Sequence, residues 1–212
     1  MRMFACPSCG AEVPFRSSLS VYAVCAYCNS MVVRRDVDVE AIGTMAALPE
    51  DMSPLQIGTE GVYQGVRFSI VGRLRIGWES GTWNEWFIVS DDSRKGWLAE
   101  AQGFYAISYE LAVPDSLPEV NSLTINDFIT LEGDSLRVVD IKDATCIGSE
   151  GELPFIAPKG RKTRSIDLLG AHGEFASIEI EHKMQGNTRL YVGNYVAWDD
   201  LKLSHLRELE GW

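Results

Sequence analysis

The chain has no apolar run of the about 18–20 residues that span a bilayer, so no transmembrane helix is expected. Its first residues, MRMFACPSCG, lack the apolar stretch of a signal peptide. Positive charge is scarce, because 19 Lys and Arg stand against 30 Asp and Glu and the net charge is −11. Such an acidic chain is poorly suited to nucleic acid or anionic lipid. We therefore expect a cytoplasmic protein that neither inserts into a membrane nor binds nucleic acid.

The usual marks of catalysis are also missing. No glycine-rich turn leads into a helix, so the common phosphate-binding signatures are absent. The histidines are scattered without i, i+4 or H-x-H spacing, at His172, His182 and His205. Cys146 has no histidine nearby to generate a thiolate, so we interpret it as a small buried hydrophobe. Without a nucleophile–base pair or an open metal site, we expect no enzymatic activity.

Four of the five cysteines lie near the N-terminus with the spacing C-x2-C-x15-C-x2-C, at Cys6, Cys9, Cys25 and Cys28. This spacing is typical of a structural zinc site, in which four thiolates leave no open position for a substrate. A redox dithiol is the alternative, but it needs a single C-x2-C pair beside a βαβ pattern. We predict a zinc ribbon over residues 1–35, with the metal supplying most of its folding energy.

The predicted ribbon carries little net charge. Its four arginines oppose Glu12 and the excess negative charge of four thiolates on one Zn²⁺; they are Arg2, Arg16, Arg34 and Arg35. The rest of the chain is strongly acidic. This distribution disfavours nucleic-acid binding, so we expect the ribbon to dock onto another protein.

Residues 36–54 mix acids, small residues and prolines, and they are predicted to be a linker with one helical turn around Glu40 to Ala47. Apolar and polar residues then alternate, as in VRFSIVGRLRI and WNEWFIVS, which is typical of strands with one buried face. Four or five such strands over residues 55–115 predict a small barrel or a strongly curled sheet.

Residues 120–205 repeat this pattern more loosely. The segment ITLEGDSLRVVDI, like GVYQGVRFSIVGR, reads as a short strand, a turn and a long strand. The chain is expected to end in a short helix that contains Leu201, Leu203 and Leu206. The predicted fold class is all-β: a four-cysteine zinc ribbon, then two related small β-barrel or curled-sheet halves, then the short helix.

These segments resemble a bacterial family catalogued as domain of unknown function 4178. The most specific shared element is the W-x-E-W strand at Trp83, Glu85 and Trp86, with GWLAE after it. The resemblance includes the ribbon, IGTEGVYQGVRFSIVGRLRI, GELPFIAPKGRKTRSIDLLG, ASIEIEH and YVGNYV, which together cover nearly the whole chain. Genes of this family resemble accessory members of clusters with envelope-stress, small membrane and polyamine-synthase-like proteins. The resemblance therefore implies a cytoplasmic adaptor with a membrane-associated partner, and it brings no established activity.

Four tryptophans lie close together among acidic residues, at Trp78, Trp83, Trp86 and Trp97. Aromatic faces and carboxylates together can bind a polyamine or a methylated ammonium group by cation–π contact. The competing interpretation is that Trp78, Trp83 and Trp97 fill the core of a barrel. Trp86 has the opposite parity to Trp83 and Phe87, so we predict an exposed interface residue.

Two further features carry charge. Glu85 shares the parity of Trp83 and is expected to point inward, where Arg73 or Arg75 would pair with it; the alternative is a general acid with a raised pKa. Asp167 is either an edge charge or a site residue. The segment PKGRKTR is predicted to be a positive patch for an acidic partner or a solvated loop, and its basic residues are Lys159, Arg161, Lys162 and Arg164.

We therefore expect a non-enzymatic, zinc-stabilised β-protein that acts as an adaptor through protein–protein contacts. Its predicted contact surfaces are the ribbon, Trp86 and the loop from Lys159 to Arg164. The alternative is a small-molecule protein that binds a polycation at the tryptophan–acid cluster from Trp83 to Trp97. A hydrolase-type enzyme without a recognisable motif is the third possibility.

Overall fold

The computed structural model describes residues 1–35, 37–48, 51–182 and 188–209. Over these ranges the chain is nearly all β, and its helical elements are two 3-10 turns, η1 (Val120–Ser122) and η2 (Trp198–Leu201). The predicted all-β fold is confirmed, and the predicted C-terminal helix is limited to η2, with Leu203 and Leu206 beyond it. In the part of the chain so described, no helix is both long and apolar enough to cross a membrane.

The body consists of two runs of five strands. The first run is β6 (Glu60–Tyr63), β7 (Val66–Trp78), β8 (Gly81–Ser90), β9 (Lys95–Ala101) and β10 (Phe104–Leu111). The second run is β11 (Phe128–Leu131), β12 (Asp134–Leu153), β13 (Lys162–Leu169), β14 (Glu174–Glu181) and β15 (Thr188–Val196). Strands β7–β10 and β12–β15 each form a four-stranded antiparallel meander.

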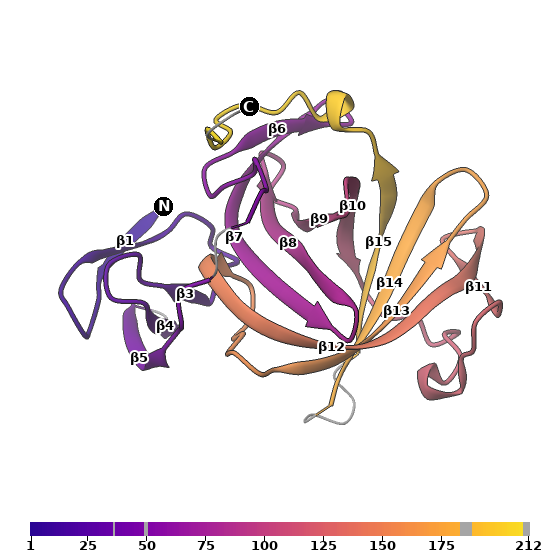
Figure 1. Ribbon diagram of the computed structural model, residues 1–212, viewed down its shortest axis with the longest axis horizontal. Helices are drawn as coiled ribbons and strands as arrows, with labels where there is room; N and C mark the ends of the chain where they lie inside the picture. The colour runs from indigo at the N-terminus through magenta and orange to yellow at the C-terminus, as the bar shows by residue number, and fades with distance from the viewer. Residues whose placement is uncertain (36, 49–50, 183–187, 210–212) are drawn as a thin grey trace.

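The two meanders close into one barrel, because β10 pairs with β15 and β7 pairs with β12 (Figure 1). A glycine allows close approach at each seam: a Cβ on Gly72 would strike the Glu152 carbonyl, and one on Gly193 would strike the Ile107 carbonyl. Each half is thus a curled sheet, as predicted. Neither half is a barrel by itself, because its two edge strands find their partners only in the other half. Eight strands enclose a space that side chains or one small ligand can fill.

Each half begins with the same hairpin. β6 turns into β7 through Gln64 and Gly65, with φ of 50° and 81°. β11 turns into β12 through Glu132 and Gly133, with φ of 52° and 98°. Positive φ at both central residues is the signature of a two-residue turn whose twist matches the strands. β6 and β11 lie outside the eight-stranded ring, each paired with the long strand that follows it.

The outer face of the barrel wall is covered in both halves. Over the first half, Trp86 and Ile88 pack in one cluster with Leu55 and with Leu201 of the C-terminal tail. Over the second half, apolar residues of β12–β15 pack with Ile129 of β11 and with partly buried residues from the connection before it. Side chains alternate along a strand, so the opposite faces of the same strands line the barrel interior.

The N-terminal ribbon joins the barrel through continuous strand pairing. It contains β1 (Arg2–Ala5), β2 (Glu12–Phe15), β3 (Tyr22–Val24), β4 (Ser30–Arg35) and β5 (Asp38–Thr44). β1 pairs with β2, whereas β5, β4 and β3 form a sheet that continues onto the end of β12.

Strand β5 corrects the prediction of a helical turn around Glu40 to Ala47 in a linker over residues 36–54. Here β5 pairs along the whole of β4, which satisfies the backbone groups on that edge, and Val39 packs on the ribbon core. Residues 36 and 49–50 of the predicted linker lie outside the described residues.

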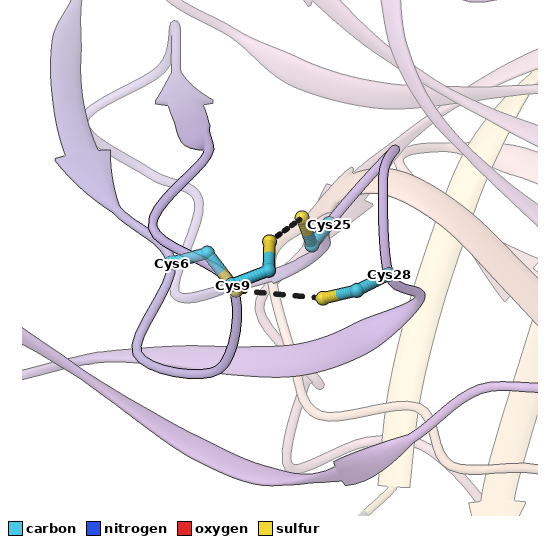
Figure 2. A group of neighbouring side chains, drawn as sticks. All are labelled: Cys6, Cys9, Cys25 and Cys28. Atoms are coloured by element: carbon cyan, nitrogen blue, oxygen red, sulfur yellow. Dashed lines mark hydrogen bonds between the residues drawn. The ribbon is translucent and has the colours of Figure 1, made fainter.

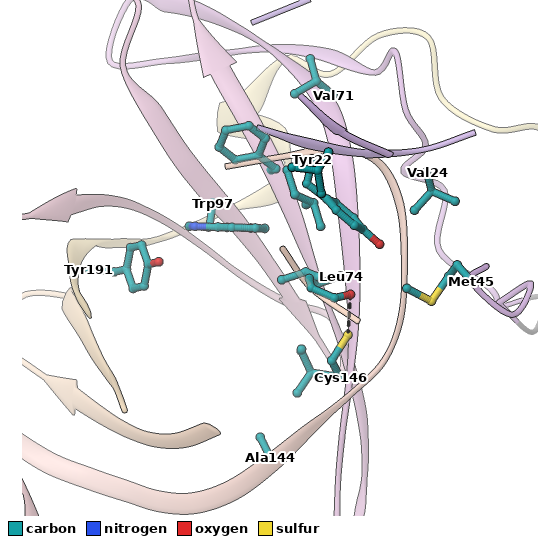
Figure 3. Close-up of a cluster of buried hydrophobic side chains, with 14 residues drawn as sticks. Tyr22, Val24, Met45, Val71, Leu74, Trp97, Ala144, Cys146 and Tyr191 are labelled. Atoms are coloured by element: carbon teal, nitrogen blue, oxygen red, sulfur yellow. Dashed lines mark hydrogen bonds between the residues drawn. The ribbon is translucent and has the colours of Figure 1, made fainter. Parts of the chain in front are cut away.

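The ribbon and the barrel share a buried core at their junction. Tyr22 of β3 is fully buried in one cluster with Phe87 and Trp97 of the barrel, and Figure 3 shows Tyr22 and Trp97 within that cluster. The buried carboxylate of Glu152 accepts hydrogen bonds from the backbone N–H groups of Arg16 and Ser17, at 2.7 and 3.2 Å. Damage to the ribbon is therefore expected to reach the end of β12.

Candidate functional site

The barrel encloses a cavity of about 900 Å³ that is lined by residues from all eight strands of the ring. We call this cavity the lumen. One wall is built from small side chains, Ala99, Ala106 and Ser108, which leave the space open. The other walls carry aromatic and acidic side chains, among them Trp83, Trp97, Tyr191, Glu85, Asp167 and Glu179. A concave site with mixed aromatic and polar walls is the usual form of a small-molecule pocket.

Strand register brings these lumen residues together. Glu85 of β8 lies opposite Ala99 of β9, and Ser177 of β14 lies opposite both Asp167 of β13 and Tyr191 of β15. Each strand alternates, so one set of side chains faces the lumen and the next set faces the outer cover. The inward prediction for Glu85 agrees with this register.

Two glutamates form the deep part of the lumen. The Trp83 indole Nε1 donates a hydrogen bond to Glu85 Oε1 at 2.9 Å. Burial, then the neighbouring Glu179 carboxylate, raises the pKa of Glu85 to about 8. Burial also raises the pKa of Glu179, although Arg161 and Arg189 oppose that shift. Within the described chain neither carboxyl has an ion-pair partner at 4 Å or less, so a ligand cation would relieve the cost of ionising them.

A second charged group lies nearer the open end of the lumen. Lys142 Nζ lies 3.1 Å from Asp167 Oδ2 and 2.5 Å from Asp140 Oδ2. It also lies 5.7 and 5.2 Å from the ring centroids of Trp78 and Trp83. Burial opposes the charged form of Lys142, but Asp167 and Asp140 more than compensate and raise its pKa. The two carboxylates thus favour the charged form of Lys142.

An aromatic ring and two arginines pack beside Trp97 of the lumen wall. Arg161 and Arg189 lie 4.7 and 4.3 Å from the ring centroid of Phe155, which packs 5.8 Å from the Trp97 ring. Arg161 also pairs with Glu181 at 3.4 Å. The Arg161 guanidinium is therefore already paired with a carboxylate and packed on an aromatic ring.

The segment PKGRKTR is consequently not a single exposed patch. Lys159 and Lys162 are exposed, whereas the Arg161 side chain is only 7% exposed and Arg164 pairs with Asp143 at 3.1 Å. Lys162 and Arg164 share one face of β13, whereas Lys159 and Arg161 precede that strand. A role for these four residues in binding a partner stays a prediction.

The prediction that Trp86 is an exposed interface residue is wrong. Trp86 is 1% exposed, donates from Nε1 to Glu100 Oε2 at 3.0 Å, and has the Arg73 guanidinium 4.7 Å from its ring centroid. The predicted pairing of Glu85 with Arg73 or Arg75 is also wrong, because Glu85 faces the lumen and the arginines do not. Both arginines lie on the outer face of β7, where they contact Asp51.

The remaining candidates lie away from the lumen. His172, His182 and His205 do not line it, and His182 pairs with Asp143 at 3.3 Å on the surface. Cys146 is buried, and burial raises the pKa of its thiol to about 11, which fits the predicted role as a small hydrophobe. Within the described ranges the lumen therefore joins Glu85 and Asp167 without a histidine.

The four N-terminal cysteines form a compact cluster, and Figure 2 shows their side chains pointing toward one another. Their sulfurs lie within 4.8 Å of one another, with 3.7 Å between Cys6 and Cys28 and 3.8 Å between Cys9 and Cys25. A tetrahedral metal with bonds of about 2.3 Å to sulfur places its ligands about 3.8 Å apart. The cluster thus has the dimensions of a four-thiolate metal site.

The backbone around the cluster repeats one turn twice. The N–H of Gly10 donates to the Cys6 carbonyl, and the N–H of Asn29 donates to the Cys25 carbonyl, both at 2.9 Å. Gly10 and Asn29 adopt positive φ of 77° and 58°, which these residue types tolerate. The two turns bring both sulfurs of each C-x2-C pair into the same cluster.

Several lumen residues were not singled out by the sequence, notably Lys142, Glu179 and Tyr191. Their signal is weak, because each lies on the more polar face of a strand whose other face is apolar. Of the lumen residues, Trp78, Trp83, Trp97, Glu85 and Asp167 were named from the sequence as candidates for a site.

Comparison with known proteins identifies the family. The family described as Domain of unknown function (DUF4178) matches residues 56–197, and the chain belongs to this family. The matched segment runs from just before β6 to just after β15, so it contains the whole barrel and excludes the cysteine cluster. Neither the curated proteins nor the solved structures contained a match.

Proposed function

We propose that the barrel is a binding protein for a small organic cation, which it holds in the lumen without a chemical step. The observation that carries this proposal is the pair Glu85 and Glu179, two carboxyl groups that face the lumen without an ion-pair partner in the described chain. The residues that line the lumen include three carboxyl groups and one ammonium group, and Lys142 pairs with Asp167, so Glu85 and Glu179 are the carboxyl groups left to ionise beside a bound cation.

Aromatic side chains in the lumen also support a cation as the ligand. Trp83 and Trp97 line the lumen beside the carboxyl groups, and an indole face attracts a cation through its ring quadrupole. Such contacts add about 0.5–2 kcal/mol, with more where water is excluded. The combination favours an alkylammonium or quaternary ammonium group over a strongly hydrated metal ion.

Ligand binding is tested by thermal denaturation with spermidine and choline as probes, and with 3,3-dimethylbutan-1-ol as the neutral counterpart of choline. We expect a saturable rise in melting temperature with at least one cation and none with the alcohol. At 100 times Kd, binding adds about 2.7 kcal/mol to the free energy of unfolding. A flat response to both cations, or an equal response to the alcohol, would contradict the proposal.

Replacement of Glu85 by glutamine is expected to weaken binding of the cation by roughly tenfold or more, because a charge-assisted contact is lost. Isothermal titration calorimetry measures the change. The matched control is Glu132→Gln, which removes an exposed carboxylate in a turn outside the barrel ring. Equal affinities of the two variants would show that the cation does not use Glu85.

Binding is also expected to depend on pH. With a pKa of about 8, Glu85 is largely protonated at pH 6 and half ionised at pH 8. Affinity for choline, which does not titrate, should therefore rise roughly 50-fold over this range in proportion to the ionised fraction. The groups that act on Glu85 or feel its charge are Glu179, Asp167, Arg161, Tyr191 and Cys146. Glu85→Gln should abolish most of the rise. If the affinity of the wild type did not change between pH 6 and 8, ionised Glu85 would not be the partner of the ligand.

Zinc is the metal we propose for the cysteine cluster, since four thiolates in a closed tetrahedral arrangement are its structural ligand set. A bound zinc ion would hold the two turns together and offer no open position for catalysis. A cytoplasmic location fits the same site, because reducing compartments keep thiols free for metal.

The shared hairpins of the two halves support a further proposal, that the two halves arose by duplication.

An adaptor function has less support than the lumen. Its principal predicted contact residue, Trp86, is buried, and the positive segment is not a single exposed patch. That function stays a prediction from the sequence.

A further inference from the structure

We infer that the mouth of the lumen is a second ammonium-binding subsite, which the chain's own Lys142 occupies and which a ligand ammonium enters by displacing it. This inference deepens the proposed function and rests on it for the identity of the natural ligand class. The subsite consists of Trp78, Trp83, Asp140 and Asp167, and we call it the mouth cage.

The contacts of Lys142 define what the cage binds. Its ammonium meets two carboxylates, at 2.5 and 3.1 Å, and two indole rings, at 5.7 and 5.2 Å from their centroids. Two aromatic faces and two carboxylates are the groups that recognise an alkylammonium ion. A lysine side chain is a butylammonium ion on a backbone, so the cage is seen with a ligand of its own class bound.

The cage is also organised independently of Lys142. Asp167 accepts hydrogen bonds from the Ser165 and Ser177 hydroxyls, at 3.1 and 2.8 Å, so its carboxylate is fixed by neighbours on β13 and β14. Trp83 is held by its own hydrogen bond to Glu85. Removal of the lysine ammonium therefore leaves one carboxylate and one indole of the cage, Asp167 and Trp83, in place.

Exchange is possible because the cage lies at an open end of the lumen. Trp78 is 40% exposed, and Tyr195 at the same end of the lumen is 46% exposed. The Asp140 side chain is 44% exposed, whereas that of Lys142 is 18% exposed. A lysine has a flexible four-carbon stem and can leave such a site without a change in the backbone.

Self-occupancy has a measurable consequence. A ligand that needs the mouth cage binds only the fraction of molecules in which Lys142 has left it, so its apparent affinity is reduced by that fraction. Lys142→Met keeps the apolar stem and removes the charge. We expect it to increase the affinity for a ligand ammonium at the mouth by roughly tenfold.

The test is chemical rescue with butylammonium, with butan-1-ol as the neutral probe. It uses the full chain with Glu85→Gln, which removes the deep carboxylate, so the mouth cage is examined separately from the proposed deep site. In this background Lys142→Ala is expected to lose thermal stability, and butylammonium is expected to restore it with saturation. Addition of Asp167→Asn should abolish the rescue, while the chain that retains Lys142 should respond weakly.

The inference is overturned if butylammonium fails to rescue, if butan-1-ol rescues equally, or if rescue persists with Asp167→Asn. Should the alanine variant not fold, Lys142→Met is titrated with butylammonium and the quenching of tryptophan fluorescence is followed instead, with the same expected and contrary results. Rescue without any binding of cations to the wild-type lumen would support the cage and reject the proposed function. If cations bind to the wild type and Lys142→Met binds them with the same affinity, the proposed function is supported and the mouth cage is rejected.

Discussion

Replacement of Trp86 by alanine is expected to lower the free energy of unfolding by about 3–5 kcal/mol, as for other fully buried large aromatic residues. Trp86 is 1% exposed and lies in the cluster that joins the outer barrel wall to Leu55 and to the C-terminal tail. Its loss would leave a cavity and would remove the indole donor from Glu100 and the aromatic face from Arg73. Urea denaturation measures the effect as a fall in the midpoint at constant m-value.

Two variants make this result specific. Trp86→Phe keeps much of the packing but removes the indole N–H, so it is expected to cost less than Trp86→Ala while still losing about 1 kcal/mol for the hydrogen bond. Trp78→Ala is the matched surface control, because Trp78 is 40% exposed and its removal creates no enclosed cavity. If Trp86→Ala were no more destabilising than Trp78→Ala, burial of Trp86 in the folded protein would be refuted.

The error over Trp86 shows what alternation in a sequence can and cannot establish. In WNEWFIVS the parity of Trp83, Glu85 and Phe87 was correctly separated from that of Trp86 and Ile88. Alternation identifies two faces, but it does not say whether the second face meets solvent. Here the covering pieces are residues near Leu55 and the C-terminal tail, and no local pattern connects them with β8.

Closure of the barrel could not be predicted from the sequence for a related reason. The strands and their hairpins follow from local alternation and from turns such as Gln64–Gly65, and these were predicted. The seams depend on pairs such as Ile76 with Cys146 and Tyr109 with Val192, which are distant along the chain. Without the seams, two curled sheets are visible in the sequence but the lumen between them is not.

The same limit explains the missed lumen residues. On β14, Ala176 and Ile178 form the apolar face and Phe175, Ser177 and Glu179 form the other. A two-sided strand of this kind is normally read as apolar inside and polar outside. In this barrel the apolar face of β14 instead meets the outer cover, and its more polar face lines the lumen. The cysteine cluster escaped this ambiguity, because its spacing alone defines the chemistry of the site.

Loss of the metal is expected to have the largest effect on the ribbon. In isolated zinc-finger peptides, metal binding supplies about 10–16 kcal/mol of apparent folding free energy at neutral pH. Cys25 is a completely buried member of the cluster, so Cys25→Ser should abolish metal binding and unfold much of residues 1–35. Metal analysis should give one zinc per wild-type chain and almost none in the variant. Cys146→Ser is the matched control, since Cys146 is also buried but lies outside the cluster.

Unfolding of the ribbon should also reach the barrel, and hydrogen exchange can show where. Because β3 pairs with the end of β12, and Tyr22 shares a buried cluster with Phe87 and Trp97, the amides near Glu152 and Leu153 should lose protection in Cys25→Ser. The pairing of β13 with β14 lies away from the ribbon and should keep most of its protection. A variant that lost zinc but kept full protection near Glu152 would mean that the ribbon is a separate attachment. Loss of protection throughout the barrel would mean instead that β12 cannot hold its seam with β7 without the metal, so the cysteine cluster would control the lumen as well as the ribbon.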